Sequence, residues 1–562
     1  MSKSFESNSK TARAVQSLSR RTFFKGLASS AGVASLPLLS GCASHSDPFL
    51  HSVASGDPLA DRVIIWTRIT AYNATGEIAS TDEQPLEIPY QWMVSLDPEF
   101  TSMVVQGEGV TSASRDFTVK EDVIGLSPGT TYYYRFVAEG WYSPTGRTKT
   151  LPVGHVERLR IAFTSCSNWT YGHFNVYGAI AARQDLDVVL HLGDYIYEYG
   201  DSYSSSKSDR VHSPNHEIIT LRDYRLRHSQ YKTDDFLQEA HRQNAFITVW
   251  DDHETANDAY KDGAQNHNEK LEGAWAARRQ YAIQAYFEWM PIREVQKSSE
   301  GINLIYRDFR FGDLMDLLML DTRIAGRTKQ SQIGNLNTLN DPEHTLLGEE
   351  QEQWLYQKLD QSKADNTAWR VLGQQVMMGH FSGGAIGFNM DQWDGYPKSR
   401  ERLFNHIIDN NIDNFVVLTG DIHSSWAMDL APNPFSIDAY DPATGEGSIG
   451  VEFVTPGVSS PGIPDPVLSA AVSTSINAAM PHMKMVDFYY RGHVLLDITH
   501  SQIQAEWHWV RTIHRPTTST FFRKAFKVLN GQSGLSAEST ATAPLASPPQ
   551  FAPKQTALQR VV

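Results

Sequence analysis

Hydrophobic and polar positions divide the chain into an all-β region followed by an alternating α/β region. Between residues 49 and 154, short runs of β-branched and aromatic residues are separated by turn residues such as Ser127-Pro128-Gly129. The clearest runs are Arg62–Arg68, Tyr90–Val94 and Thr131–Val137. Short strands bounded by turn signals predict a small β-sandwich.

From residue 158 onward, runs that are apolar at consecutive positions alternate with helical patterns. The four runs are Leu159–Phe163, Val188–Leu192, Phe246–Trp250 and Phe415–Leu418. Such strands are buried on both faces, as in a parallel sheet covered by helices. Residues 273–288 have a helical stripe, while 492–499 and 504–509 alternate as half-buried strands do. The Ala-, Ser-, Thr- and Pro-rich end of the chain, about 25 residues, predicts a mobile tail.

Length and charge exclude several classes of protein. The chain has 562 residues, more than the roughly 250–300 at which one core usually stops growing, so two or more domains are expected. A hydrophobic content of 41% excludes disorder throughout. With 49 basic and 64 acidic residues the net charge is −15, and the absence of a basic block predicts no nucleic-acid-binding role. The carboxylates either solvate the surface or bind hard cations.

Residues 1–41 have the pattern of an export signal. A basic segment with the pair Arg20-Arg21 precedes the apolar stretch Gly26–Leu39, which predicts a twin-arginine signal peptide. That stretch is shorter than the roughly 20 residues of a membrane span. The signal ends in Leu39-Ser40-Gly41-Cys42, which resembles a bacterial lipobox with Cys42 as the lipid-anchored residue. A plain signal peptide is the alternative.

The mature chain would therefore begin with a spacer, residues 42–48, and work in the periplasm or outside the cell. Its expected partner during export is the twin-arginine machinery, and its expected anchor is a lipid on Cys42. Cys166 is the other cysteine of the chain. If Cys42 carries a lipid, Cys166 has no disulfide partner and is free to bind a metal.

Groups that bind metals follow all four buried strands. Ligands of an α/β sheet collect beyond the carboxyl ends of its strands. The four strand ends are Thr164–Asn168, Gly193–Tyr197, Asp251–Glu254 and Gly420–His423. They supply thiol, carboxyl, phenol and imidazole groups, so we expect one metal site where they meet.

The softness of these groups points to two kinds of ion. Thiolate, phenolate and imidazole together suit Fe(III). The candidate iron ligands are Cys166, Tyr197 and His423. Oxygen ligands alone favour Ca²⁺ or Mg²⁺. The candidates for these ions are Asp252, Asp421 and either Asn168 or Asn257. Asp194, in a Gly-Asp turn, is the candidate bridge between the ions and the first candidate for a catalytic role.

Paired cations about 3.5–4 Å apart clamp a phosphoryl group and lower the pKa of a bridging water. The chain has neither a Gly-x-Ser-x-Gly elbow nor a Walker loop, so a metal-bound oxygen is the expected nucleophile. His253 is a candidate proton donor to the leaving group; its alternative is a histidine that orients a ligand. Asp251, beside Asp252 on the alternate face of the strand, is expected to stay outside the site.

Three further residues are candidates for binding substrate phosphate: Arg225, His228 and His380. Arg225 and His228 belong to the densest basic cluster near the loop that follows the second buried strand, and guanidinium groups bind phosphate well. A charged helix face is the alternative for this cluster. His380, in Gly379-His380-Phe381, is a ligand, a phosphate donor or a hydrogen-bonded pocket histidine.

The ordered motifs resemble those of the PhoD-type alkaline phosphatases of bacteria. The first motifs are Ser52–Pro58 and Ile64–Arg68. The later ones are Ser165-Cys166, Gly193–Glu198, Tyr224-Arg225, Tyr231-Lys232, Trp250–Glu254, Leu320–Arg323, Trp393–Tyr396 and Gly420–Ser424. They run in family order, and the resemblance extends from about residue 49 to 510.

The resemblance implies a metallophosphatase αββα sandwich, residues 155–515, preceded by an immunoglobulin-like β-sandwich domain, residues 49–154. Residues 516–562 would form a C-terminal segment and tail. The implied Fe(III) ligands are Cys166, Asp194, Tyr197 and His423. The implied ligands of one or two Ca²⁺ ions are Asp194, Asp252 and Asp421.

The function that the resemblance favours is an exported phosphatase that hydrolyses phosphomonoesters and phosphodiesters. A second hypothesis is a phosphodiesterase, similar to phospholipase D, that acts on lipid or polymer phosphodiesters. A third is a lipoprotein that binds cations or phosphate without turnover.

Overall fold

The computed structural model describes residues 47–72, 78, 87–201, 208–294, 296–298, 301–382, 389–538, 540–554 and 559–561. The predicted export signal and Cys42 lie outside these ranges. Residues Ser46–Val562 form one compact unit.

Two mixed β-sheets pack face to face around the main core. The larger one, in the described part of the chain, has the strand order β22 (Ser536–Glu538), β21 (Thr520–Leu529), β20 (Gln502–Val510), β19 (Gly492–Thr499), β9 (Arg158–Thr164), β10 (Val188–His191), β11 (Ala245–Thr248), β1 (Val53–Gly56), β2 (Arg62–Arg68) and β5 (Thr118–Ile124). Strands β9, β10, β11 and β1 are parallel. The apolar runs predicted at 159–163, 188–192 and 246–250 supply three of them, because strands buried on both faces need apolar residues throughout.

The second sheet has, among the described residues, the order β12 (Arg307–Phe311), β13 (Met315–Met319), β14 (Trp369–Gly373), β15 (Phe415–Thr419), β17 (Gly450–Val454), β16 (Ser425–Leu430) and β18 (Met483–Asp487). Its strands β13, β14, β15 and β17 are parallel. Ile161 and Val189 of the larger sheet share one hydrophobic core with Leu317 and Val416 of this sheet. The two sheets therefore form the inner layers of a sandwich.

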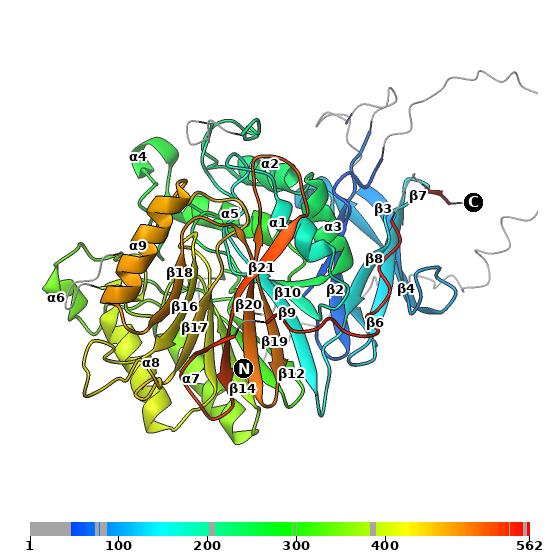
Figure 1. Cartoon of the computed structure of the whole chain (residues 1–562). Coiled ribbons are helices and arrows are strands. Elements are labelled where there is room, and N and C mark those ends of the chain that lie inside the picture. The colour runs from blue at the N-terminus through cyan, green and yellow to red at the C-terminus, as the bar shows by residue number, and fades with distance from the viewer. Residues whose placement is uncertain are drawn as a thin grey trace, which may run out of the picture. The chain divides into compact units, whose positions relative to one another are not determined.

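Helices cover the outer faces of both sheets (Figure 1). The helices are α1 (Asn175–Ala181), α2 (Leu221–Tyr231), α3 (Asp235–Gln243), α4 (Glu269–Glu272), α5 (Trp275–Trp289), α6 (Leu336–Leu339), α7 (Glu349–Ala364), α8 (Pro397–Asp409) and α9 (Pro466–Ala479). Helices α1 and α3 pack on the larger sheet, and α7 and α8 pack on the second through a separate core that contains Leu355 and Leu403. The predicted αββα sandwich is confirmed. Over the residues that can be described, no helix is both long and apolar enough to cross a membrane.

The N-terminal β-region is a sandwich that shares a sheet with the rest of the molecule. One side has the order β23 (Gln559–Arg560), β7 (Trp141–Tyr142), β6 (Thr131–Ala138), β3 (Glu87–Ser95) and β4 (Met103–Ser112), with β8 (Gly146–Lys149) also paired to β6. Its other side is β2 and β5, which belong to the larger sheet. Val63 and Val119 of that sheet share a core with Val94 and Phe136. The β-sandwich is therefore continuous with the αββα layers.

Gly56 makes this continuity possible. Strand β1 runs parallel to β11, with Gly56 opposite Phe246. A Cβ atom at residue 56 would lie 2.3 Å from the carbonyl oxygen of Pro291 and 2.6 Å from that of Phe246. Only glycine allows the two backbones to approach this closely.

The C-terminal segment is an ordered strap, so the prediction of a mobile tail is wrong for its described residues. Arg160, which is fully buried, donates a hydrogen bond to the carbonyl oxygen of Ala543. Arg242 donates to the carbonyl oxygen of Pro553 at 2.9 Å, and Gln243 exchanges two 3.0 Å hydrogen bonds with the backbone of Ala552. Buried guanidinium groups need acceptors, and backbone carbonyls of a proline-rich segment supply them without forming a strand.

A chain truncated after Thr540 should be less stable than the full chain. Removing the strap takes acceptors from Arg160 and Arg242, and hydrogen bonds to charged groups contribute on the order of 1–3 kcal/mol each. Thermal unfolding of the two chains measures the effect. Truncation after Lys554 is the matched control, because it keeps these acceptors. If the two truncated chains have the same Tm, the strap does not stabilise the fold.

Candidate metal centre

Four of the predicted ligands lie at strand ends on residues with left-handed backbone. Cys166 follows β9, Asp194 follows β10, and Asp421 and His423 follow β15. Their φ angles are 60°, 56°, 58° and 52°. Such angles cost non-glycine residues about 1–3 kcal/mol each and are concentrated at functional sites. The surrounding structure holds four ligand-bearing residues in unfavourable conformations at one edge of the sandwich.

The loops after β9, β10 and β11 are in direct contact. Gly193 has a φ of 104°, and a Cβ atom there would lie 2.6 Å from the backbone nitrogen of Asp251. The N–H of Cys166 donates to the carbonyl oxygen of Gly193 at 3.1 Å, and that of Ser167 donates to Asp194 at 2.8 Å. Only a residue without a side chain fits at position 193.

Four predicted ligands of different softness meet at these loops. One ligand atom each from Cys166, Asp194 and His423 lies within 4.8 Å of the others. The Tyr197 hydroxyl donates to Asp194 Oδ2 at 2.8 Å and lies 3.1 Å from His423 Nε2. Thiol, carboxyl, imidazole and phenol groups therefore surround one position, as the sequence predicts.

An acidic cluster adjoins this position. Carboxylate oxygens of Asp251, Asp252 and Asp421 lie within 4.8 Å of one another, and Asp194 forms a further group with Asp252 and His253. Asp194 is thus shared between the thiol-containing group and the acidic side. The expectation that Asp251 stays outside is wrong, because the chain turns sharply after β11 and strand alternation no longer decides where side chains point.

Arg323 provides the main positive charge within the acidic cluster. Its side chain is fully buried and donates to Asp251, to Asp391 at 2.6 Å and to Asp421 at 3.1 Å. Burial would raise the pKa of Asp252, but Arg323 and His253 outweigh it and lower that pKa to about 2. For Asp421, burial and the neighbouring carboxylates raise the pKa more than Arg323 lowers it, so the pKa lies well above its usual range.

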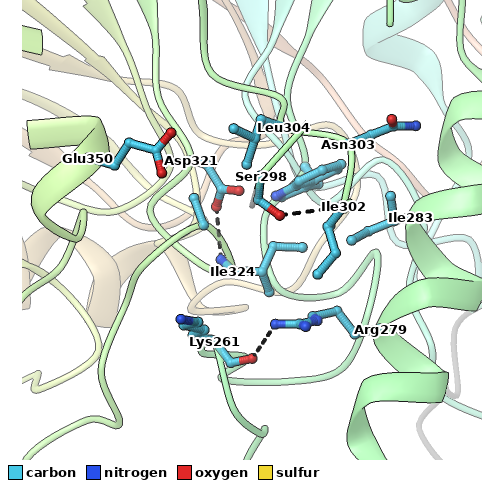
Figure 2. Close-up of a pocket in the computed structure, with 12 residues that line it drawn as sticks. Lys261, Arg279, Ile283, Ser298, Ile302, Asn303, Leu304, Asp321, Ile324 and Glu350 are labelled. Carbon is cyan, nitrogen blue, oxygen red and sulfur yellow. Dashed lines mark hydrogen bonds between the residues drawn. The ribbon is translucent and has the colours of Figure 1, made fainter. Parts of the chain in front are cut away.

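Sequence reasoning gave Arg323 no role, although the signal was present. Arg323 follows β13 at the same edge as the candidate metal ligands, in the motif Leu320–Arg323. Asp321 accepts hydrogen bonds from the backbone N–H groups of Arg323 and Ile324 at 2.9 Å, and Figure 2 shows the second of these. Asp321 also lines a cavity of about 80 Å³ together with Trp250. The turn that holds Arg323 is therefore built by its own aspartate.

Two glutamates, also without a role in the sequence analysis, hold the loops and His253. Glu254 accepts from the N–H groups of Asp194 at 3.1 Å and Asp251 at 2.8 Å, so one carboxylate ties two loops together. Burial and the charge of Asp194 raise the pKa of Glu254 to about 8. Glu198 Oε2 lies 2.7 Å from Nδ1 of His253. Burial lowers the pKa of His253, but Asp252 and Glu198 outweigh it, so the pKa is well above its usual value.

The donor set fits metal ions. Buried oxygens without a hydrogen-bond partner include Asp194 Oδ1, Asp251 Oδ2 and Asp252 Oδ1. Buried carboxylate oxygens are normally paired or coordinate a metal. Burial and then the charge of Asp194 raise the pKa of the Cys166 thiol and of the Tyr197 hydroxyl well above their usual values. Ionised forms of these two groups therefore require a nearby cation, which a metal supplies.

The two candidate asparagines differ in their surroundings. Asn168 is fully buried near Cys166, but its Oδ1 accepts from Thr170 at 3.0 Å. The Oδ1 of Asn257 accepts from the Tyr199 hydroxyl at 2.8 Å. Both amide oxygens already have donors, so neither is an unpaired ligand.

Arg225 and His228 lie on α2 and do not face the cluster. The Arg225 guanidinium donates to Glu288 on α5 through Nε and Nη2 at 2.7 Å, and Nη2 also donates to the carbonyl oxygen of Ser114 at 2.8 Å. The fully buried ring of His228 packs at 6.4 Å from that of Trp289. Their predicted role in binding phosphate is not supported: α2 turns them toward α5, and the helix-face alternative describes Arg225.

His380 is a pocket histidine in this structure. Its Nδ1 accepts from Arg400 at 2.9 Å, and its backbone carbonyl lies 2.8 Å from His482 Nε2. Burial and then Arg400 lower its pKa to about 2, so the ring is neutral. Within the described residues, His380 belongs to none of the groups that could hold a metal.

Together, an αββα sandwich and a mixed thiol, imidazole, phenol and carboxylate centre at its strand ends define a metallophosphatase-like protein. The model of the PhoD-like phosphatase family matches residues 161–507, and that of its N-terminal domain matches residues 37–152. Alkaline phosphatase D of Bacillus subtilis is 37% identical over 507 residues, covering 88% of this chain and 83% of its own. A solved structure of PhoD superposes with a TM-score of 0.78 at 35% identity, covering 90% of this chain and 94% of that one.

The chain belongs to the PhoD-like phosphatase family. The resemblance stated from the motifs is confirmed, and so is the prediction of an enzyme of the alkaline phosphatase type. The domain boundary predicted at residue 154 lies between the two matched ranges.

Asp194→Asn should lose at least one metal ion and reduce kcat by several orders of magnitude. The change keeps the shape of the side chain but removes the charge shared between the two halves of the site. A fall of a thousandfold corresponds to about 4 kcal/mol of transition-state stabilisation. Metal analysis and steady-state kinetics on the purified variant measure both effects.

Asp429→Asn is the matched control. Asp429 is equally buried but binds Tyr440 and Lys484 at the other end of the second sheet. This variant should lose stability and keep its metals. Equal metal loss in both variants would contradict a bridging role for Asp194.

Proposed function

We propose that the chain is an exported, metal-dependent phosphatase that hydrolyses phosphomonoesters and phosphodiesters through an iron and calcium centre. The observation that carries this proposal is the shared position of Asp194, between Cys166 and His423 on one side and Asp252 on the other. A centre with soft and hard halves suits two kinds of ion rather than one.

Cys166, Tyr197, His423 and Asp194 would hold Fe(III), while Asp194, Asp252 and Asp421 would hold one or two Ca²⁺ ions. Paired cations of this kind clamp a phosphoryl group and lower the pKa of water when bound. Arg323 keeps Asp251 and Asp421 together at the same edge through charge-assisted hydrogen bonds. It acts as a positioning residue for the carboxylates.

His253 would donate a proton to the leaving oxygen. Its Nδ1 is engaged by Glu198 at 2.7 Å, so Nε2 is the nitrogen left for a substrate. A histidine oriented by a carboxylate keeps a defined tautomer and direction. Glu198 therefore fixes the ring while Nε2 holds the proton.

Export through the twin-arginine route and a lipid on Cys42 complete the proposal. The support is the sequence of residues 1–42 alone, with its paired Arg20-Arg21 and its lipobox. Folded proteins pass through this route, so a metal centre assembled before export would reach the periplasm or the cell surface intact.

Protein purified from its native compartment should contain iron and calcium and should show a visible phenolate-to-iron band.

Cys166→Ser should lose iron and most activity while the fold survives, because a hydroxyl replaces the thiolate. Ser459→Ala is the control, since Ser459 is buried beside the site and its hydroxyl donates to the carbonyl oxygen of Asn168 at 2.7 Å. A colourless, fully active zinc enzyme would refute the iron assignment.

Substrate tests separate the proposed activity from its alternatives. Release of p-nitrophenol from p-nitrophenyl phosphate and from its bis-ester is expected, and a strong preference for phospholipid would favour the phospholipase-like hypothesis.

His253→Gln should slow an alkyl phosphate far more than p-nitrophenyl phosphate, because p-nitrophenolate leaves without a proton. His406→Gln is the control, as His406 lies on α8 and pairs with Asp360 of α7 at 2.9 Å. Equal slowing of both esters would exclude proton donation by His253.

A further inference from the structure

A second group of metal-binding side chains lies away from the candidate metal centre. It consists of His155, Asp313 and His500, and one ligand atom from each lies within 4.8 Å of the others. The remaining groups in the described residues all contain Asp194 or Asp252. The His155 cluster therefore shares no residue with the proposed phosphatase site.

The cluster occupies the opposite edge of the sandwich. His155 precedes β9, whose carboxyl end leads to Cys166. Asp313 lies in the turn between β12 and β13, and His500 lies in the turn between β19 and β20. Thr499 pairs with Arg158, so the His500 turn lies beside the start of β9. The three segments come from both sheets, and the proposed ligands bring the two sheets together at this edge.

The distances suit a tetrahedral ion. His155 Nδ1 lies 2.9 Å from Asp313 Oδ2, and His500 Nε2 lies 3.4 Å from Asp313 Oδ1. Ligand atoms about 2.0–2.1 Å from a tetrahedral Zn²⁺ lie about 3.3 Å from one another. One carboxylate oxygen of Asp313 and one nitrogen of each histidine lie within 4.8 Å of one another, so modest shifts of these side chains would bring them to this geometry.

Two features go beyond an ordinary His–Asp pair. Both imidazoles direct a nitrogen at the same carboxylate, and their rings stack with centroids 4.9 Å apart at an interplanar angle of 13°. His500 Nε2 is buried and has no hydrogen-bond partner. The N–H of Val156 donates to Asp313 Oδ1 at 3.0 Å, which fixes the carboxylate in place.

We propose that His155, Asp313 and His500 form a second site for a divalent transition ion, with Zn²⁺ as its occupant, water as the fourth ligand and stabilisation of the fold as its role. Two imidazoles and one carboxylate suit Zn²⁺ better than Ca²⁺, which prefers oxygen ligands. The ion joins the linker before β9 to one hairpin of each sheet. An ion that binds only the folded state stabilises it.

The test uses the enzyme with its own metals in place, to which Zn²⁺ is added. Wild type is compared with the double variant His155→Ala/His500→Ala by equilibrium dialysis, zinc analysis and thermal unfolding. Zinc that enters the phosphatase centre enters both proteins alike, so the difference between them reports the second site. We expect one zinc equivalent fewer in the double variant and the loss of a zinc-dependent rise in Tm.

His406→Ala is the matched control, because it also removes a histidine that pairs with an aspartate and lies outside every candidate metal group of the described residues. It should bind as much zinc as wild type. Phosphatase activity should be the same in all three proteins, so a failure of the proposed function does not affect the zinc result. Equal zinc content and equal zinc-dependent Tm shifts in wild type and the double variant would overturn the proposal.

Discussion

The convergence of buried carboxylates at one edge of the sandwich is the constraint on which the rest of the site depends. Asp194, Asp251, Asp252 and Asp421 repel one another in a region of low dielectric, and burial by itself raises the pKa of Asp251, Asp252 and Asp421. The single guanidinium of Arg323 contacts three of the four. Unpaired carboxylate oxygens remain, and these are the ones that metal ions would satisfy. The contacts between the loops and the hydrogen bonds of Glu254 hold these charges together, at the cost of strained backbone conformations.

Neither sheet could build this site alone. The larger sheet supplies Cys166, Asp194 and Asp252 from the ends of three parallel strands, and the second sheet supplies Asp421 and Arg323 from its own. Face-to-face packing places the two sets of strand ends at the same edge. The stability of the core between the sheets and the geometry of the catalytic edge are therefore linked. A zinc ion bound by the His155 cluster would join the two sheets at the other edge.

Much of the fold and of the site could be predicted because the signals are local. Consecutive apolar residues identify strands buried on both faces, and the residues that follow each strand must lie near its carboxyl end. This reasoning brought Cys166, Asp194, Tyr197 and His423 together correctly. It failed for Asp251, where a turn cancels strand alternation, and for His228, where the direction of a helix decides which way a basic residue points. It also missed the strap, since a proline-rich segment owes its order to distant arginines such as Arg160.

The sequence by itself determined the strands, the residue types at their ends and the family, because these depend on periodicity, softness and motif order. Only the tertiary structure decided which carboxylates share Arg323, that Glu254 holds two loops, and that His155 lies beside His500 although 345 positions separate their numbers. The physical reason is that a contact between distant segments depends on how sheets pack and loops turn. Neighbouring residues in the sequence carry little information about it.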